Sequence, residues 1–348
     1  MRPAEHLNVP REIKPVELSR FWNGKLAPYM GANNRKAIFQ FVSTLALFAV
    51  NWTLMYFSMR WSYLLTLALA VPAVGLLTRL FIFQHDCGHG SFFSSRRWNT
   101  VIGSFIGLLT LTPYHYWRRT HAVHHATSGD LDRRTLGDVQ LLTVKEYEGQ
   151  GFWGRLRYRA YRNPLVLFGV GPIWQFVLKH RLPLDAPWKW KKEWGSVGIT
   201  NAAIAAVLIT AHFTIGLKAF FMVQIPITLI GGVVGIWLFY IQHQFEDTYW
   251  REHEEWDFCR AGIQGSSYYD LPNWLHWFTG NIGFHHVHHL ASRIPNYNLK
   301  RCYREVQELH RVTRLTLLQS LRCARLHLWD ERTQKLVGFR DLRRLREV

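Results

Sequence analysis

Residues 61–89 read WSYLLTLALAVPAVGLLTRLFIFQHDCGH. The stretch is apolar from Trp61 to Phe83, and about 20 such residues are enough to cross a bilayer as a helix. It runs directly into His85 and His89. Residues i and i+4 lie on the same face of a helix. The stretch therefore predicts a membrane-spanning segment that leads into a helical pair of imidazoles pointing in one direction.

Three other apolar runs are long enough to span a bilayer, at residues 38–57, 197–217 and 219–241. Together with residues 61–83 they form two tight hairpins, whereas the apolar runs at 101–111 and 165–178 are too short to span. We expect an all-α integral membrane protein with four transmembrane helices in two hairpins and a cytoplasmic helical cap. The alternative is a soluble α-protein with buried core helices, which four spanning runs in tight hairpins disfavour.

The distribution of charge predicts which side of the membrane the polar segments occupy. Lys and Arg number 42 against 24 Asp and Glu, giving a net charge of +18, and nearly all the basic residues lie outside the two hairpin turns. The positive-inside rule places such segments in the cytoplasm. We divide the chain into a cytoplasmic N-terminal segment (1–36), a membrane domain (37–318) and a basic cytoplasmic tail (319–348).

The basic excess suits an anionic membrane face or an acidic protein partner. Nucleic acid is excluded as a partner, because the basic residues flank apolar spans and no nucleic-acid motif appears. The cysteines form no Cys-x-x-Cys pair and no disulfide framework, which predicts free thiols in a reducing compartment; they are Cys87, Cys259, Cys302 and Cys323.

Two further histidine motifs share the spacing His-x-x-His-His, at residues 121–125 and 285–289. On a helix this spacing also gathers the rings on one face. With His243, just past the last apolar run, nine imidazoles become candidate metal ligands: His85, His89, His121, His124, His125, His243, His285, His288 and His289. One tetrahedral zinc site takes four ligands, so nine indicate two metal centres. Imidazole suits Fe, Cu, Ni and Zn.

The motifs differ from two common metal sites. They lack the Glu-x-x-His pairs of soluble di-iron carboxylate bundles and the His-Glu-x-x-His of zinc proteases. We expect Asp86 and Asn281 to support the metal site, Asp86 by accepting a hydrogen bond from a ligand and Asn281 by orienting a metal-bound water. Four other carboxylates have sequence positions from which they could support a ligand, although each alone is typical of a helix-capping or surface residue: Asp130, Asp138, Glu246 and Asp247.

The remaining histidines are interpreted as structural. His286 breaks the ligand spacing and is expected to pack or to support a ligand, and His115 and His276 lie near the motifs but outside their pattern. Isolated histidines are usually surface or satisfied core residues; they are His6, His180, His212, His310 and His327.

The three histidine motifs together resemble those of the membrane fatty acid desaturases. The neighbouring words Trp117–Thr120, His243–Asp247 and Ser292–Tyr297 look like the bacterial branch close to the Δ12 (omega-6) enzymes. The resemblance covers roughly residues 37–318. It implies a cis double bond introduced into a lipid acyl chain, with O₂ as co-substrate, at two non-haem iron ions held by the motif histidines. It also suggests a bacterial inner membrane location with both termini and the active site cytoplasmic.

The resemblance implies a fatty acyl lipid as substrate, and two electrons must come from outside because no flavin or nicotinamide motif is visible. A ferredoxin or a cytochrome b5-like protein that docks on the basic face is the expected donor. The motifs do not indicate whether the acyl chain is carried by a phospholipid, CoA or ACP. A related membrane di-iron hydroxylase or carotenoid oxygenase would use similar motifs. A metal transporter would need more ionisable residues in its spans than Arg79 and His212, and a scaffold protein would not need nine convergent imidazoles.

Overall fold

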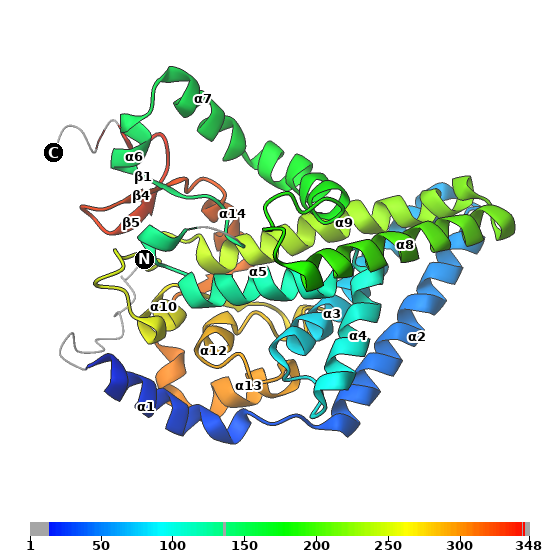
Figure 1. The fold of residues 1–348 in the computed structure, drawn as a ribbon, viewed down its shortest axis with the longest axis horizontal. Coiled ribbons are helices and arrows are strands. Elements are labelled where there is room, and N and C mark those ends of the chain that lie inside the picture. Colours follow the sequence, from blue (N-terminus) through cyan, green and yellow to red (C-terminus); the bar gives the residue numbers. More distant parts are fainter. Residues whose placement is uncertain (1–13, 135–136, 343, 345–348) are drawn as a thin grey trace.

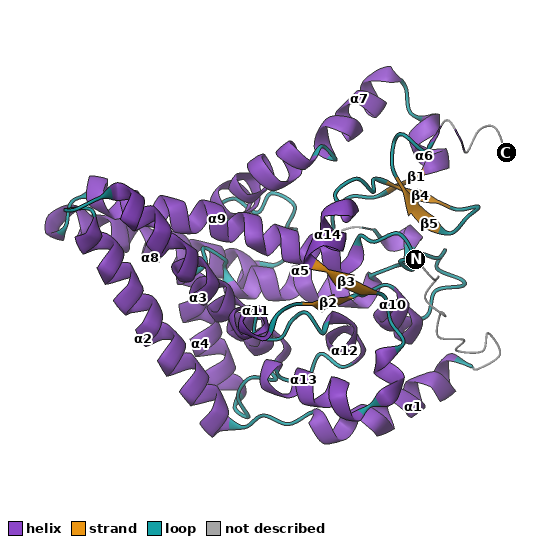
Figure 2. Ribbon diagram, turned by 180° about the vertical axis from the view of Figure 1, so that it is seen from behind, coloured by secondary structure: helices purple, strands orange, loops and turns teal. Residues whose placement is uncertain are grey.

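The computed structural model describes residues 14–134, 137–342 and 344, so His6 lies outside the described residues. In this part of the chain, four helices are long and apolar enough to cross a membrane. They are α2 (Asn34–Ser58), α3 (Tyr63–His89), α8 (Lys191–Thr214) and α9 (Leu217–His243). They fill the right side of Figure 1 and the left side of the reverse view in Figure 2. The predicted helical class and the four spans are confirmed.

The helices α3 and α9 continue past the predicted ends of their apolar runs at residues 83 and 241. Hydropathy marks where lipid contact ends, whereas helical hydrogen bonding continues until the backbone is interrupted. For α3 the interruption is Gly90, whose φ of +70° ends the helix in the left-handed region that glycine tolerates. The helix α9 ends at His243. The first histidine pair and His243 are therefore parts of the spanning helices themselves.

Both hairpin turns lie at the end of the bundle away from the cap, at the upper right of Figure 1. Polar side chains join the helices near these turns. Asn51 donates to the carbonyl of Leu69 at 2.9 Å, which links α2 to α3, and the indole of Trp52 donates to Gln224 at 3.2 Å, which links α2 to α9. Such interhelical hydrogen bonds stabilise packing where the surrounding lipid offers no hydrophobic driving force.

The cap consists of short elements that precede, connect or follow the spans. Its helices are α1 (Pro15–Leu26), α4 (Arg96–Leu109), α5 (Tyr114–Thr127), α6 (Val144–Gly149), α7 (Phe152–Tyr161), α10 (Phe258–Gln264), α11 (Asn273–Phe278), α12 (His285–Leu290), α13 (Asn296–Glu305) and α14 (Leu317–Cys323). Single turns of 3₁₀-helix are η1 (Ala27–Tyr29), η2 (Leu131–Arg133) and η5 (Gln307–His310), and π-helical turns are η3 (Val166–Val170) and η4 (Ile173–Lys179). The two sub-span apolar runs thus fall in α4 and in the π-helical turns.

Two small sheets complete the cap. Parallel strands β2 (Tyr268–Asp270) and β3 (Arg314–Thr316) form one. In the other, β4 (Leu328–Asp330) pairs in parallel with β1 (Leu142–Thr143) and antiparallel with β5 (Lys335–Val337). The described part of the predicted basic tail therefore folds back as α14, β4 and β5. Its Trp329 is only 1% exposed, packed with other apolar side chains of the cap.

Candidate metal centre

The first histidine pair is positioned by the end of α3, where α5 crosses it closely. Gly88 makes this crossing possible, because a Cβ there would lie 2.9 Å from Cζ3 of Trp117 on α5. The Trp117 ring in turn stacks on His121, with ring centroids 4.6 Å apart and planes at 15°. The sequence signal for this contact is local, a glycine inside the first motif and a tryptophan one helical turn before the second.

A turn with unusual backbone geometry positions the third motif. Gly280 and Asn281 have φ of +53° and +59° in succession, which reverses the chain just before α12. Gly283 follows, and a Cβ at this position would lie 2.6 Å from the carbonyl oxygen of Tyr269. Every residue of α12 is buried. The turn therefore inserts a short helix of histidines beneath the ends of α3 and α9.

All nine predicted side chains meet, in two groups. The first group is His85, His89, His121, His125 and His288, and the second group is His124, His243, His285 and His289. Within each group the nearest ring nitrogens all lie within 4.8 Å of one another. The two groups adjoin, because the rings of His125 and His289 stack at 4.2 Å. His89 and His121 are partly exposed, whereas the four histidines of the second group are buried.

Each His-x-x-His-His motif is divided between the groups. In α5 the i, i+4 pair His121 and His125 joins the first group while His124 joins the second; in α12 the pair His285 and His289 joins the second and His288 the first. This differs from the expectation that each motif points in one direction. The face shared by i, i+3 and i+4 is wide enough to straddle the boundary between two adjacent sites.

The spacing of the nitrogens fits metal ligation. Nε2 of His121 lies 3.1 Å from Nε2 of both His89 and His125. Nε2 of His288 is 3.0 Å from Nε2 of His125, and Nε2 of His285 is 2.9 Å from Nε2 of His243. Two nitrogens bound at right angles to one ion, at about 2.1 Å each, are separated by about 3 Å. Both groups therefore have the donor set and the spacing that a metal ion needs.

Two Nε2 atoms of the second group have no hydrogen-bond partner among the described residues, although both are buried. They are Nε2 of His124 and Nε2 of His289. A buried polar atom without a partner costs free energy. A metal ion between the four rings would give these lone pairs a partner.

Carboxylates and carbonyls face the outer nitrogens of three rings. Nδ1 of His85 lies 3.2 Å from Asp86, Nδ1 of His124 lies 2.5 Å from Asp138, and Nδ1 of His243 lies 3.0 Å from the carbonyl of Gly265. A proton held on Nδ1 leaves the Nε2 lone pair free for a metal. Asp86 thus occupies the supporting position expected for it. Asp138 was only one of four further carboxylates suggested by the sequence.

Other suggested residues lie elsewhere. The side-chain amide of Asn281 donates to the carbonyl of Asn296 at 3.1 Å, so Asn281 reaches the histidine groups only through Asn296. It is Asn296 that contacts Asp86, donating to Oδ2 from its backbone at 2.7 Å and its side chain at 2.8 Å. Sequence reasoning did not single out Asn296. Asp130 accepts from His253 at 2.9 Å, and Glu246 and Asp247 pair with Lys335.

The histidines outside the two groups have structural surroundings. His286 is fully buried and its ring lies 5.6 Å from that of Tyr303, so it packs away from the clustered rings. His180 is buried and its Nδ1 lies 3.2 Å from the carbonyl of Leu111. His276 stacks on Phe284, the residue before α12. The interpretation of His286 as a packing residue agrees with this position.

Burial also determines the charge state of the clustered rings in the cap. It lowers the pKa of His121, His285 and His289 well below the ordinary value of 6.5, and neighbouring imidazoles lower it further. His125 and His288 shift in the same direction for the same reasons. The rings are therefore neutral at pH 7, and a neutral imidazole offers the lone pair that a metal binds.

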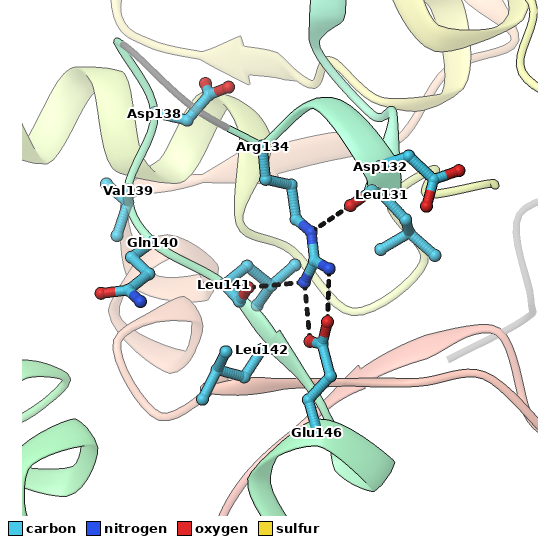
Figure 3. A pocket seen from close by; sticks show the side chains of 9 residues that line it. All are labelled: Leu131, Asp132, Arg134, Asp138, Val139, Gln140, Leu141, Leu142 and Glu146. Atoms are coloured by element: carbon cyan, nitrogen blue, oxygen red, sulfur yellow. Dashed lines mark hydrogen bonds and ion pairs between the residues drawn. The ribbon is translucent and has the colours of Figure 1, made fainter. Parts of the chain in front are cut away.

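A cavity of about 470 Å³ opens on the outer side of Asp138 (Figure 3). The guanidinium of Arg134 occupies its centre and is already paired with Glu146 at 2.6 Å and with the carbonyls of Leu131 and Leu141. The remaining lining mixes polar residues with the apolar Val139 and three leucines. This cavity does not contain the histidine groups, and its cation has its partners.

Comparison with known proteins identifies the family. A family model described as fatty acid desaturase matches residues 59–317, which include all nine clustered histidines. The fatty acid desaturase of Bacillus subtilis (strain 168) is 42% identical over 321 residues, covering 92% of this chain and 91% of that protein. The sn-1 oleoyl-lipid 12-desaturase of Anabaena variabilis is 27% identical over 249 residues, 67% of this chain and 66% of that one. An Arabidopsis thaliana protein, sn-2 acyl-lipid omega-3 desaturase (ferredoxin), chloroplastic, is 30% identical over 238 residues, 63% and 50%.

The family match covers well over half of the chain, and the Bacillus relative aligns along nearly all of it. Four spanning helices and two histidine groups able to hold metal agree with that match. The chain belongs to the fatty acid desaturase family of membrane oxidoreductases, which act on lipid acyl chains.

Proposed function

We propose that this protein introduces a cis double bond into the acyl chain of a membrane lipid, using O₂ and two external electrons at a pair of iron ions. The observation that carries the proposal is the pair of adjoining histidine groups at the ends of α3 and α9, with buried ring nitrogens that have no partner among the described residues. Such a pair suits the oxidation of an unactivated C–H bond at the boundary between lipid and cap.

The nine histidines are proposed as the metal ligands, five in the first group and four in the second. Zinc is redox-inactive, so an oxidation with O₂ calls for a redox metal that imidazole binds, and the family resemblance favours iron. When bound, the metal pair supplies the oxidising chemistry that removes two hydrogens from adjacent methylenes. The chain's part is to hold three outer ring nitrogens through Asp86, Asp138 and the Gly265 carbonyl, which keeps each Nε2 directed inward.

We propose the Δ12 position of an oleoyl glycerolipid as the site of the new double bond. The support is the resemblance of the motif words to Δ12 enzymes and the similarity to sn-1 oleoyl-lipid 12-desaturases from Anabaena variabilis and Synechocystis. A membrane lipid also suits the position of the histidine groups, because both groups include residues at the ends of the spanning helices α3 and α9.

The cap is proposed to lie in the cytoplasm of a bacterial cell, with the spans in the inner membrane. The turns between the paired spans, residues 59–62 and 215–216, contain a single basic residue, Arg60. The cap carries most of the 42 Lys and Arg residues. The positive-inside rule orients such a chain with the cap inward. Reporter fusions at residues 60 and 348 test the orientation.

The electron donor is proposed to be a small acidic carrier such as a ferredoxin or a cytochrome b5-like protein. The net charge of +18 supports electrostatic docking, and the Arabidopsis relative carries ferredoxin in its name. Salt screens such docking. Reduction by the carrier should therefore slow as ionic strength rises at constant carrier concentration, and a rate indifferent to salt contradicts the docking.

The deciding experiment expresses the full chain in a host whose lipids contain only monounsaturated acyl chains, together with a ferredoxin system. Mass spectrometry of the fatty acids should show dienoic chains with the new cis bond at Δ12. The variant His288→Ala should show none. Hydroxylated chains instead of dienes would favour a hydroxylase, and no product from a metal-loaded, reducible protein would contradict the proposal.

A further inference from the structure

Arg162 follows α7 and is almost completely buried, with 1% of its surface exposed. A buried guanidinium normally requires a carboxylate partner. The hydrogen bonds of Arg162 instead end on four neutral acceptors. These are the carbonyl of Gln140 at 3.1 Å, the hydroxyl of Tyr240 at 3.1 Å, the amide oxygen of Gln244 at 2.9 Å and the carbonyl of Leu326 at 2.9 Å. One side chain thus joins three distant segments of the chain.

Two of these segments support the second histidine group. Tyr240 and Gln244 bracket His243 at the end of α9, so Arg162 holds the last turn that carries this ring. Gln140 lies two residues after Asp138, whose carboxylate is 2.5 Å from Nδ1 of His124. Arg162 therefore fixes the distance between the segments that support His243 and His124.

The third segment comes from the C-terminal part of the cap. Leu326 accepts from Arg162 and also from the Tyr240 hydroxyl at 2.9 Å. Farther along, the backbone of Leu336 in β5 donates to the carbonyl of Glu246 at 2.9 Å, just after α9. The region between α14 and β5 therefore closes over the end of α9 from outside.

The first histidine group has different support. His85, its first member on α3, is held through Asp86 and Asn296. None of the four acceptors of Arg162 adjoins His85, His89 or His288 in the sequence. Replacing Arg162 should therefore affect the second histidine group more than the first.

We propose that Arg162 is a positioning residue for the second histidine group, clamping the end of α9 to the segment of Asp138, with the C-terminal part of the cap completing the clamp. The planar guanidinium offers five N–H donors in a fixed arrangement, which a lysine ammonium does not reproduce. The inference rests on the proposed function, because it assumes that each group binds one metal ion.

The test is the binding of Co²⁺ to the purified full-length protein in detergent, counted by equilibrium dialysis with metal analysis, alongside melting temperatures without metal. The wild type should bind two ions per chain. Arg162→Met should bind the first with unchanged affinity and the second about tenfold or more weakly, and Arg162→Lys should show the same selective loss. The control is Arg314→Met, which removes an arginine that pairs with Asp270 in the same cap; it should bind both ions as the wild type does.

A second variant distinguishes a loss of positioning from misfolding of the Arg162→Met protein. Gln244→Leu removes one acceptor and leaves Arg162 in place, so it should lower the affinity for the second ion by a smaller factor than Arg162→Met does. The inference is overturned if Arg162→Met and Gln244→Leu keep both affinities. It is also overturned if both affinities fall together with the melting temperature. A wild-type chain that binds fewer than two ions would instead contradict the metal pair of the proposed function, and the inference with it.

Discussion

The most informative single substitution is Asp86→Asn, which keeps the shape of a buried side chain and removes its charge. The Asp86 carboxylate accepts two hydrogen bonds from Asn296, at 2.7 and 2.8 Å, and its other oxygen lies 3.2 Å from Nδ1 of His85. An asparagine has one oxygen for these three contacts. If that oxygen keeps the Asn296 bonds, its NH₂ group faces His85.

An NH₂ group at this position favours the tautomer of His85 that carries its proton on Nε2. That tautomer cannot offer Nε2 to a metal. Loss of an outer carboxylate of this kind weakens metal binding by about 10–100-fold, which corresponds to roughly 1.4–2.7 kcal/mol. The two bonds from Asn296 also lose their charge assistance, about 1–1.5 kcal/mol each. This second loss applies with and without metal, whereas the first applies only to the metal-bound protein.

The assay is the rise in melting temperature that saturating Fe²⁺ or Co²⁺ produces in the purified protein under anaerobic conditions. For a protein of this size a loss of 1.4–2.7 kcal/mol should reduce that rise by roughly 2–4 °C. The matched control is Asp270→Asn, the same chemical change at a carboxylate that pairs with Arg314 in the cap. If Asp86→Asn shows the full metal-dependent rise and the full metal content, the reasoning about His85 is wrong.

Three further outcomes are expected. His288→Ala should abolish double-bond formation, whereas His286→Phe should retain metal and product, because the His286 ring packs beside Tyr303 and away from the groups; fatty acid analysis and metal counting distinguish the two. Asp138→Asn should weaken one of two bound ions by about 10–100-fold, since it removes the partner of a buried ligand ring; equal binding of both ions would contradict the role given to Asp138. Burial lowers the pKa of His180 to about 3, so the folded state favours the neutral ring while the unfolded ring titrates near 6.5. The contribution of His180 to stability should be constant above about pH 6.5 and fall as the pH decreases toward 3, and His180→Asn should make the fall of the melting temperature with decreasing pH shallower.

The sequence alone was sufficient for features that local patterns determine. Apolar runs of spanning length predicted α2, α3, α8 and α9. The periodicity of a helix placed each His-x-x-His-His motif on one face, but that face divides its rings between the two groups. The ends of α3 and α9 were underestimated, because an apolar criterion stops at the first polar residues while the helix continues. Glycines at 88 and 283 were visible, but their function depends on neighbours that only the fold brings close.

Features that depend on contacts between distant segments were not predictable. Asp86 and Asn296 are 210 positions apart and meet only because α12 and α13 pack under α3. Asp138 was one of four similar carboxylates, and nothing in its sequence neighbourhood distinguished it from Asp130, which pairs with His253 instead. Arg162 looked like one more basic residue in a basic segment. Its burial depends on the return of the C-terminal part of the chain, which the sequence suggested was an appended tail.

The division of each motif between the two groups has a consequence for how this centre can change. Because α5 and α12 each contribute to both groups, a rotation of either helix moves ligands at both at once. A one-residue insertion before His121 would turn the motif by about 100° and direct its rings away from both ions together. A change in the length of either helix would therefore disturb both histidine groups. Natural variation in these two helices should consist of substitutions and hardly ever of changes in length.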